Sequence, residues 1–259
     1  MTHRILSTVC ALLLATSLQA GETLRLAVTT SFHNSGLADV LLPVIAKDLN
    51  LEVQLLVVGT GQALKLGEQG DVDAILVHSR TAEDAFLNQG FGTHRREIMY
   101  NDFVLIGSDT DPAHIQTATT AADALHKISM AQTTFVSRGD DSGTHKKEVS
   151  LWKTAGLDTE QFGPWYTSVG AGMGAALNTA SGLNAYIMSD RASWLNFANK
   201  GTLALLYSGD PVLFNQYAYI PVNPEGKPHI KYDLALKLES WLVSDQAKAL
   251  IDSYKINGE

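Results

Sequence analysis

Short apolar stretches of strand length alternate with amphipathic stretches of helical length along most of this 259-residue chain. Residues 24–28, 51–58 and 73–78 have the apolar content of strands, and a segment with helical features follows each of them. Periodic apolar residues mark the first helix after Ser35, and Thr81 begins the third with acidic residues behind it. Parallel strands need crossover connections, which are usually helices. The alternation therefore predicts an α/β fold with a mainly parallel sheet.

The alternation resumes in the second half of the chain. The periodicity predicts these further elements: helix 120–127, strand 133–137, helix 142–155, strand 165–169, helix 174–181, strand 185–189, helix 192–199, strand 203–207, strand 216–223 and a long amphipathic helix over 231–252. The simplest arrangement is two α/β lobes joined by two extended crossings near residues 103–108 and 217–222. Lobe 1 then comprises residues 21–105 and 218–259, and lobe 2 comprises residues 106–217. A single doubly wound sheet of the same elements is the alternative.

The first 20 residues are typical of a cleaved secretory signal. Arg4 precedes an apolar run at residues 9–15, and small or polar residues follow it. This run is too short to span a membrane. We therefore expect residues 1–20 to be removed and the protein to be exported to the periplasm. The only cysteine, Cys10, lies in this segment, so the exported chain is expected to have no disulfide, catalytic thiol or cysteine-based metal site.

The charge pattern narrows the range of partners. The formal net charge is −8, and no stretch of the chain is rich in lysine and arginine. This disfavours nucleic acid and anionic membrane surfaces as partners. The histidines show no H-x-x-x-H or H-E-x-x-H spacing, so no metal site is expected. We expect a monomer that carries no cofactor.

Four junctions between a strand and the following helix are rich in glycine, serine and threonine. They are residues 28–36, 57–63, 136–145 and 168–176. Ligands of open α/β sheets bind beyond the carboxyl ends of the strands, where helix N-termini offer unpaired amides and partial positive charge. Serine and threonine add hydroxyl donors. One such loop would be an ordinary helix cap, whereas four in one chain indicate an anion-binding site.

The stretch FVSRGDDSGTHKKE, residues 135–148, supplies the strongest candidate for the positive charge of such a site. Arg138 ends a strand, and Ser142 is placed to cap the next helix. Asp140 and Asp141 then have two uses, since one can orient the guanidinium group and the other can stabilise the start of the helix. The alternative is an ordinary cap beside a surface Arg–Asp pair.

Other functions fit these residues less well. The RGD tripeptide at residues 138–140 matches an adhesion motif, but so short a pattern is common by chance. A serine nucleophile is disfavoured because the chain has no G-x-S-x-G motif. A dinucleotide site fits better, since Gly170 to Ala175 matches G-x-G-x-x-A after a strand and Asp190 lies twenty residues beyond Gly170. That alternative implies an exported dinucleotide-dependent enzyme.

Long blocks of the chain resemble the periplasmic tungstate-binding proteins of ABC importers, the TupA type. The resemblance covers essentially the whole chain after residue 20. It is carried by VTTSFHNSGL, VVGTGQALKLGEQGDVDAILVH, MYNDFVLIGSDTDPAHI, FVSRGDDSGTHKKEVSLWKTAG, VGAGMGAAL and QYAYIPVNP. The GTGQAL, YNDFVLIG and SRGDDSGTHKKE blocks are long and specific.

The resemblance implies a two-lobed clamshell, each lobe a mainly parallel sheet flanked by helices. It implies that the protein binds tungstate, often molybdate as well, and delivers it to a membrane ABC permease without catalysis. The anion-binding residues that it implies are Thr29, Thr30, Ser31, Gly59, Thr60, Arg138, Ser142, Gly143 and Thr144, with Gly172 and Met173 near the cleft. The sequence departs from the family pattern at Val28, Phe32 and His33. Sulfate and phosphate share the tetrahedral outline of tungstate, so they are the alternative ligands.

Overall fold

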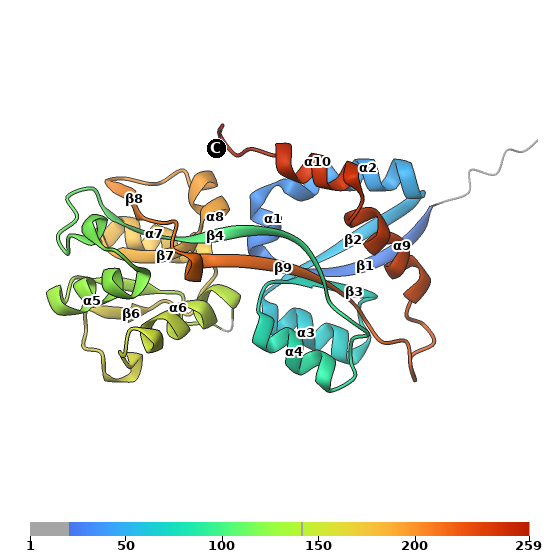
Figure 1. Cartoon of the computed structure of the whole chain (residues 1–259), viewed down its shortest axis with the longest axis horizontal. Helices are drawn as coiled ribbons and strands as arrows, with labels where there is room; N and C mark the ends of the chain where they lie inside the picture. Colours follow the sequence, from blue (N-terminus) through green and yellow to red (C-terminus); the bar gives the residue numbers. More distant parts are fainter. Residues whose placement is uncertain (1–20, 141, 259) are drawn as a thin grey trace, which may run out of the picture.

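The computed structural model describes residues 21–140 and 142–258, which form two α/β lobes joined by two long strands (Figure 1). The expected signal segment at residues 1–20 lies outside the described residues, as does Asp141. Within the described part of the chain, no helix has the length and apolar content needed to cross a membrane.

Lobe 1 is built from the N-terminal part of the chain and the C-terminal helices. Its elements are β1 (Glu22–Thr29), α1 (Thr30–Ser35), α2 (Leu37–Leu49), β2 (Leu51–Val58), α3 (Thr60–Gln69), β3 (Ala74–Val77), α4 (Arg80–Asn88), β9 (Phe214–Pro221), α9 (Tyr232–Leu242) and α10 (Asp245–Ser253). The strand order is β2-β1-β3-β9, with β9 antiparallel to β3 and the other pairs parallel. Helices α2, α9 and α10 pack on one face of this sheet, and α3 and α4 pack on the other.

Lobe 2 has the same layered arrangement. Its elements are β4 (Arg96–Ser108), η1 (Ile115–Thr117), α5 (Ala121–Ala131), β5 (Phe135–Ser137), α6 (Gly143–Thr154), η2 (Thr159–Gln161), β6 (Tyr166–Ser168), α7 (Met173–Leu183), β7 (Tyr186–Asp190), α8 (Arg191–Asn196), β8 (Leu203–Tyr207) and η3 (Pro211–Leu213). Strands β6, β5 and β7 are parallel, and β4 runs antiparallel to both β7 and β8. Helices α5 and α6 pack on one face, and α7 and α8 on the other.

The passage between the lobes is a paired antiparallel ribbon, which Figure 1 shows as β4 and β9 side by side. Strand β4 pairs with β9 up to Asp102 and with β7 of lobe 2 from Phe103 onward. Strand β9 pairs with β3 of lobe 1 from Ala218 onward. Residues 103–108 of the first expected crossing pair with β7 and β8 of lobe 2, and residues 218–221 of the second pair with β3 of lobe 1. The ribbon between the lobes therefore lies a few residues before each of these segments.

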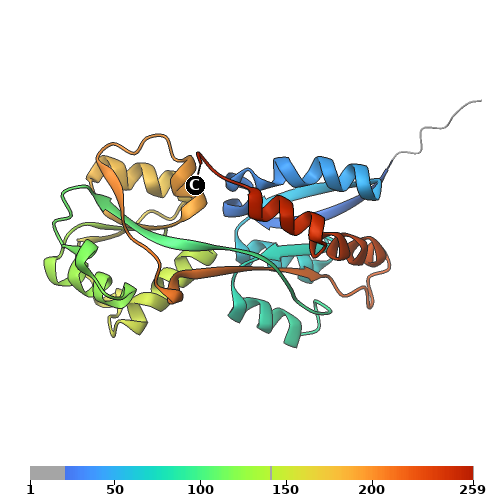
Figure 2. The same cartoon turned by 45° about the horizontal axis from the view of Figure 1, so that its top comes forward.

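The C-terminal helix also differs from the sequence prediction. The expected helix over residues 231–252 is divided into α9 and α10, because Ser244 caps a new helix by accepting from the Ala247 amide at 3.2 Å. The chain then returns toward lobe 2, where Asn257 Nδ2 donates to the Leu195 carbonyl at 3.0 Å (Figure 2).

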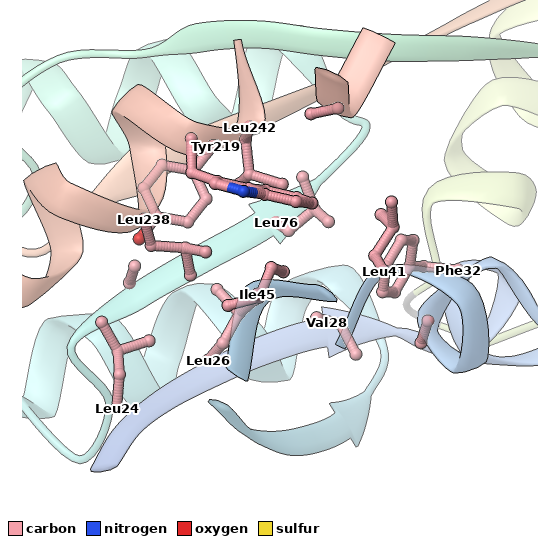
Figure 3. Close-up of a cluster of buried hydrophobic side chains, with 14 of the residues drawn as sticks. Leu24, Leu26, Val28, Phe32, Leu41, Ile45, Leu76, Tyr219, Leu238 and Leu242 are labelled. Atoms are coloured by element: carbon pink, nitrogen blue, oxygen red, sulfur yellow. The ribbon is translucent and has the colours of Figure 1, made fainter. Parts of the chain in front are cut away.

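Each lobe has its own hydrophobic core, which is why the lobes are separate bodies on either side of the ribbon. In lobe 1, Leu24 and Leu26 of β1 point toward Ile45 of α2 and Leu238 of α9 (Figure 3). These side chains alternate along the strand, so one face of β1 is buried by the helices. Full burial of each such side chain contributes roughly 1.5–3 kcal/mol.

Candidate anion-binding site

The junction between β1 and α1 fixes a group of hydroxyls. Thr29 ends β1 and caps α1, since its Oγ1 accepts from the Phe32 amide at 3.3 Å. Ser31 Oγ lies 3.0 Å from Thr29 Oγ1 and 2.7 Å from the Tyr217 hydroxyl of β9. The side chains of Thr29 and Ser31 are buried, whereas Thr30 is half-buried. The first donor-rich loop is therefore folded inward against β9.

Thr60 and His78 add two more polar groups from lobe 1. Gly59 precedes α3, and Thr60, the first residue of that helix, is buried. His78 directly follows β3, and its Nε2 lies 3.1 Å from Ser31 Oγ. Burial lowers the pKa of His78 to about 4, so the imidazole is neutral near pH 7. The donor-rich loop motifs indicate neither His78 nor Tyr217; the sequence signal for His78 is its position directly after a strand.

Lobe 2 contributes Arg138 at the end of β5 and the first residues of α6. Arg138 Nη2 donates to Asp140 Oδ2 at 2.6 Å, and the Ser142 hydroxyl donates to Asp140 Oδ1 at 2.5 Å. Ser142 caps α6, because its Oγ accepts from the His145 amide at 3.1 Å. Arg138, Ser142 and Thr144 are all buried. Asp140 thus makes the orienting contact expected of one of the two aspartates.

Gly143 brings the two groups together across the interface between the lobes. A Cβ atom placed on Gly143 would lie 2.8 Å from His78 Cε1, 3.0 Å from His78 Nδ1 and 3.1 Å from Thr60 Oγ1. The first turn of α6 therefore packs directly against the edge of lobe 1. The structure thus gathers three of the four donor-rich loops, 28–36, 57–63 and 136–145, at one place.

Three polar atoms at this place are buried and have no hydrogen-bond partner among the described residues: Thr60 Oγ1, His78 Nδ1 and Arg138 Nε. A buried polar group without a partner costs about 1–3 kcal/mol, so nearly all such groups in folded proteins are paired. The guanidinium group of Arg138 only donates, and the Thr60 hydroxyl has a proton to donate. The chemistry of the site therefore suits a ligand that accepts hydrogen bonds and carries negative charge.

In the described part of the chain, no three His, Asp or Glu side chains lie close enough together to hold a metal ion. The carboxylate of Asp140 is already bound to Arg138 and Ser142.

The fourth donor-rich loop, residues 168–176, lies beside the Arg138 loop, because the Ala171 amide donates to the Arg138 carbonyl at 3.2 Å, but most of its residues are not buried. Gly172 is exposed, and a Cβ atom on it would meet nothing within 4 Å. Met173 packs its side chain in the core of lobe 2. Gly174 borders a small cavity together with Asn34 of lobe 1, so the start of α7 lies at the edge of the interface.

A cleft of about 640 Å³ opens beside the buried group. Its lining includes Arg80, Lys146 and Lys147, together with His78 and Gly143. Burial lowers the pKa of Lys147 from its ordinary value. The cationic side chains line an approach from solvent toward the partnerless atoms, in a chain whose formal net charge is −8.

The sequence profile of the PBP superfamily domain matches residues 15–246 of this chain. The chain therefore belongs to the PBP superfamily. It is 43% identical over 238 residues to the tungstate-binding protein TupA of Peptoclostridium acidaminophilum, which covers 91% of this chain and 82% of that protein. It is 38% identical over 230 residues to TupA of Campylobacter jejuni, which covers 87% of this chain and 85% of that protein. Within the superfamily, the chain belongs to the family of these TupA proteins.

Solved structures agree with this assignment. The structure of the tungstate ABC transporter from Geobacter sulfurreducens matches with a TM-score of 0.83 and 47% identity, over 90% of this chain and 99% of that chain. TupA from Desulfovibrio alaskensis G20 matches with a TM-score of 0.82 and 44% identity, over 92% of this chain and 97% of that chain. The two-lobed α/β fold predicted from the resemblance is thereby confirmed, and the single doubly wound sheet is excluded.

Proposed function

We propose that this chain is an extracytoplasmic solute-binding protein that captures tungstate, and also molybdate, between its lobes. It then delivers the anion to a membrane ABC permease. The observation that carries the proposal is the pair of partnerless donors at the interface, Thr60 Oγ1 from lobe 1 and Arg138 Nε from lobe 2. The TupA relatives support the choice of ligand, because those proteins are named for tungstate binding.

The proposed anion-binding residues include these two donors. They are Thr29, Thr30, Ser31, Gly59, Thr60, Arg138, Ser142, Gly143 and Thr144, with Gly172 and Met173 near the cleft. A desolvated dianion is stable in a protein only when hydrogen-bond donors surround it. The charge of Arg138 is partly offset by Asp140 at 2.6 Å, so neutral donors carry much of the stabilisation. Sulfate and phosphate are the alternative ligands, since they have the same tetrahedral shape.

Binding without catalysis is part of the proposal, and two arrangements support it. Ser137 Oγ lies 3.2 Å from His145 Nδ1, but the serine is buried and donates its proton to Glu148 Oε2 at 2.8 Å, so it is no free nucleophile. Asp190, the acidic residue of the dinucleotide motif, is buried and accepts from the Ser193 amide at 2.9 Å. A carboxylate engaged in capping α8 is poorly placed to bind a ribose.

Closure of the two lobes is the proposed mechanism of capture. We place the lobe boundaries near residues 102 and 217 and the hinge in the ribbon segments 99–102 and 214–217. An anion bound by both lobes contacts more donors in the closed form, so its binding favours closure. The proposal includes removal of residues 1–20, function in the periplasm as a monomer, and recognition of the closed form by the permease.

A ligand panel tests the proposed function. Sodium tungstate, molybdate, sulfate, phosphate and a nicotinamide dinucleotide are added to the purified protein, and thermal unfolding is followed. A ligand present at a thousand times its dissociation constant stabilises a protein by about 4 kcal/mol. We expect the largest shift with tungstate, a comparable one with molybdate and smaller ones with sulfate and phosphate. A shift with the dinucleotide alone would overturn the proposal.

Small-angle scattering tests closure separately. The radius of gyration is measured for the ligand-free protein and again with saturating tungstate. We expect a decrease on binding. An unchanged radius, in protein shown to be ligand-free at the start, would leave a rigid pocket in place of the clamshell.

A further inference from the structure

His78 is the one partnerless group at the interface that the loop motifs do not predict. It is 9% exposed, lies at the carboxyl end of β3 and packs against the ring of Tyr217, with the ring centroids 4.6 Å apart and the ring planes tilted by 41°. Its two ring nitrogens differ in surroundings: Nε2 lies 3.1 Å from Ser31 Oγ, while Nδ1 has no partner among the described residues. Nδ1 points to the side of the ring where Gly143 and Thr60 lie.

The hydroxyls around Ser31 indicate which ring nitrogen carries the proton. Burial raises the pKa of Tyr217 above its ordinary value, so its phenol stays protonated and can donate to Ser31 Oγ at 2.7 Å. Thr29 Oγ1, 3.0 Å away, accepts from the Phe32 amide and has its own proton to donate to Ser31. Ser31 Oγ then accepts twice and donates its one proton to His78 Nε2. In this arrangement the hydroxyls of Thr29, Ser31 and Tyr217 are all paired. The ring N–H then lies on Nδ1, which has no partner within hydrogen-bond distance, although the Asn215 side chain is near the ring.

The free N–H lies beside a second free donor. The Cβ position of Gly143 is 3.0 Å from His78 Nδ1 and 3.1 Å from Thr60 Oγ1, so both atoms face the first turn of α6. The amides at the start of that helix add partial positive charge at the same point. An acceptor-only anion is the ligand that satisfies donors grouped in this way.

We propose that neutral His78 binds the oxyanion by donating its Nδ1–H to a ligand oxygen, while Ser31 and Tyr217 fix the tautomer through Nε2. This inference rests on the proposed function and adds a ligand-binding residue to it. It also assigns Ser31 a positioning role in addition to any direct contact. A neutral imidazole provides a donor without adding a charge that must be desolvated.

Paired substitutions separate the two nitrogens. His78→Asn places an amide NH₂ near the position of Nδ1, whereas His78→Gln places one near the position of Nε2. Tungstate affinity is measured by calorimetry, with thermal unfolding of each variant as the check on folding. We expect His78→Gln to bind roughly tenfold to a hundredfold more weakly than the wild type, and His78→Asn to retain more of the affinity. The reverse order, or equal affinity in both variants and the wild type, would overturn the inference.

The wild-type protein gives an independent readout that needs no variant to fold. Nitrogen-15 spectra of histidine-labelled protein report the tautomer of each histidine ring. The His78 signals are identified as those that are missing from the spectrum of either variant. If both variants unfold, they are identified by the coupling of the ring to buried hydroxyls. We expect protonated Nδ1, with its signal shifting when tungstate is added. Two results would reject only the role of His78: protonation at Nε2, or His78 signals that do not shift on addition of tungstate although calorimetry shows that tungstate binds. Absence of tungstate binding in the wild type would instead reject the proposed function.

Discussion

Gly143 of lobe 2 lies directly against His78 of lobe 1, and a Cβ atom on Gly143 would be 2.8 Å from His78 Cε1. Contacts closer than about 3 Å between such atoms do not occur in folded proteins without movement of one partner. His78 is buried and packed against Tyr217, so its ring has little room to move. The glycine is therefore what lets the first turn of α6 approach lobe 1.

A larger side chain at position 143 should hold the lobes apart. We expect Gly143→Val to weaken tungstate binding by roughly tenfold or more, about 1.4 kcal/mol, because the closed form is lost. The melting temperature without ligand should change little, since each lobe has its own core. Gly174→Val is the matched control: it changes a glycine near the start of α7, where a Cβ atom meets nothing within 4 Å. Equal calorimetric affinity of both variants would contradict the steric role of Gly143.

Removal of the Arg138 guanidinium should lower oxyanion affinity strongly. Arg138 is 4% exposed, and loss of one member of a buried charge pair typically costs about 2–5 kcal/mol. Arg138→Lys should recover part of this loss, because lysine keeps the charge but not the planar set of donors. Arg96→Ala is the control, since Arg96 is exposed, binds Glu239 at 3.1 Å and does not line the cleft. Tungstate affinity is measured by calorimetry. If Arg138→Ala binds tungstate as tightly as the wild type, Arg138 does not bind the anion.

The lysines of the cleft should accelerate association. Lys147 lines the approach to Gly143, and a positive charge there attracts an anion to a protein that is otherwise acidic. We expect Lys147→Gln to lower the association rate several-fold at low salt and to leave the dissociation rate unchanged. The effect should shrink at higher salt, as the screening length falls from about 30 Å at 0.01 M to about 8 Å at 0.15 M.

Stopped-flow tryptophan fluorescence measures these rates. Lys153→Gln is the control, because Lys153 is exposed on the same helix and does not line the cleft. Equal association rates for the two variants would show that the charge near the cleft has no special effect.

Protonation of His78 should destabilise the folded protein in acid. Burial lowers the pKa of His78 from 6.5 to about 4, so the unfolded chain binds the proton more tightly than the folded one. The stability due to neutral His78 is fully present above about pH 6.5 and is lost as the pH falls toward about 4, by about 3 kcal/mol. His145 and Asp190, whose pKa values are raised, act in the opposite direction.

Subtracting the unfolding free energy of His78→Gln from that of the wild type removes the contributions of His145 and Asp190, which are common to both proteins. The free energy of unfolding is measured with urea at several pH values for both proteins. As the pH falls from about 6.5 to 4, the wild type should lose stability relative to the variant, so the difference between their unfolding free energies should narrow. A difference in unfolding free energy that is constant with pH would mean that the folded protein does not hold His78 neutral.

The sequence by itself determined the elements and the donors. Apolar periodicity predicted strand 51–58, which is β2 with the same bounds, because the spacing of buried side chains is a local property of the chain. The same applies to the cap Ser142, whose Oγ accepts from an amide three residues away. The helix expected over 231–252 failed at Ser244, where a local cap interrupts an amphipathic pattern that continues on both sides.

Only the tertiary structure decided which polar groups form the site. Ser31 and Tyr217 are 186 residues apart in sequence, and no local pattern relates them. Met173 satisfies the same loop motif as its glycine neighbours, yet packs in the core of lobe 2. His78 joined Thr60 and Arg138, which were already candidates from the sequence, because the meeting of the lobes buries all three and leaves each with an atom that has no partner among the described residues. Burial and pairing depend on contacts between distant segments, so the fold decides them.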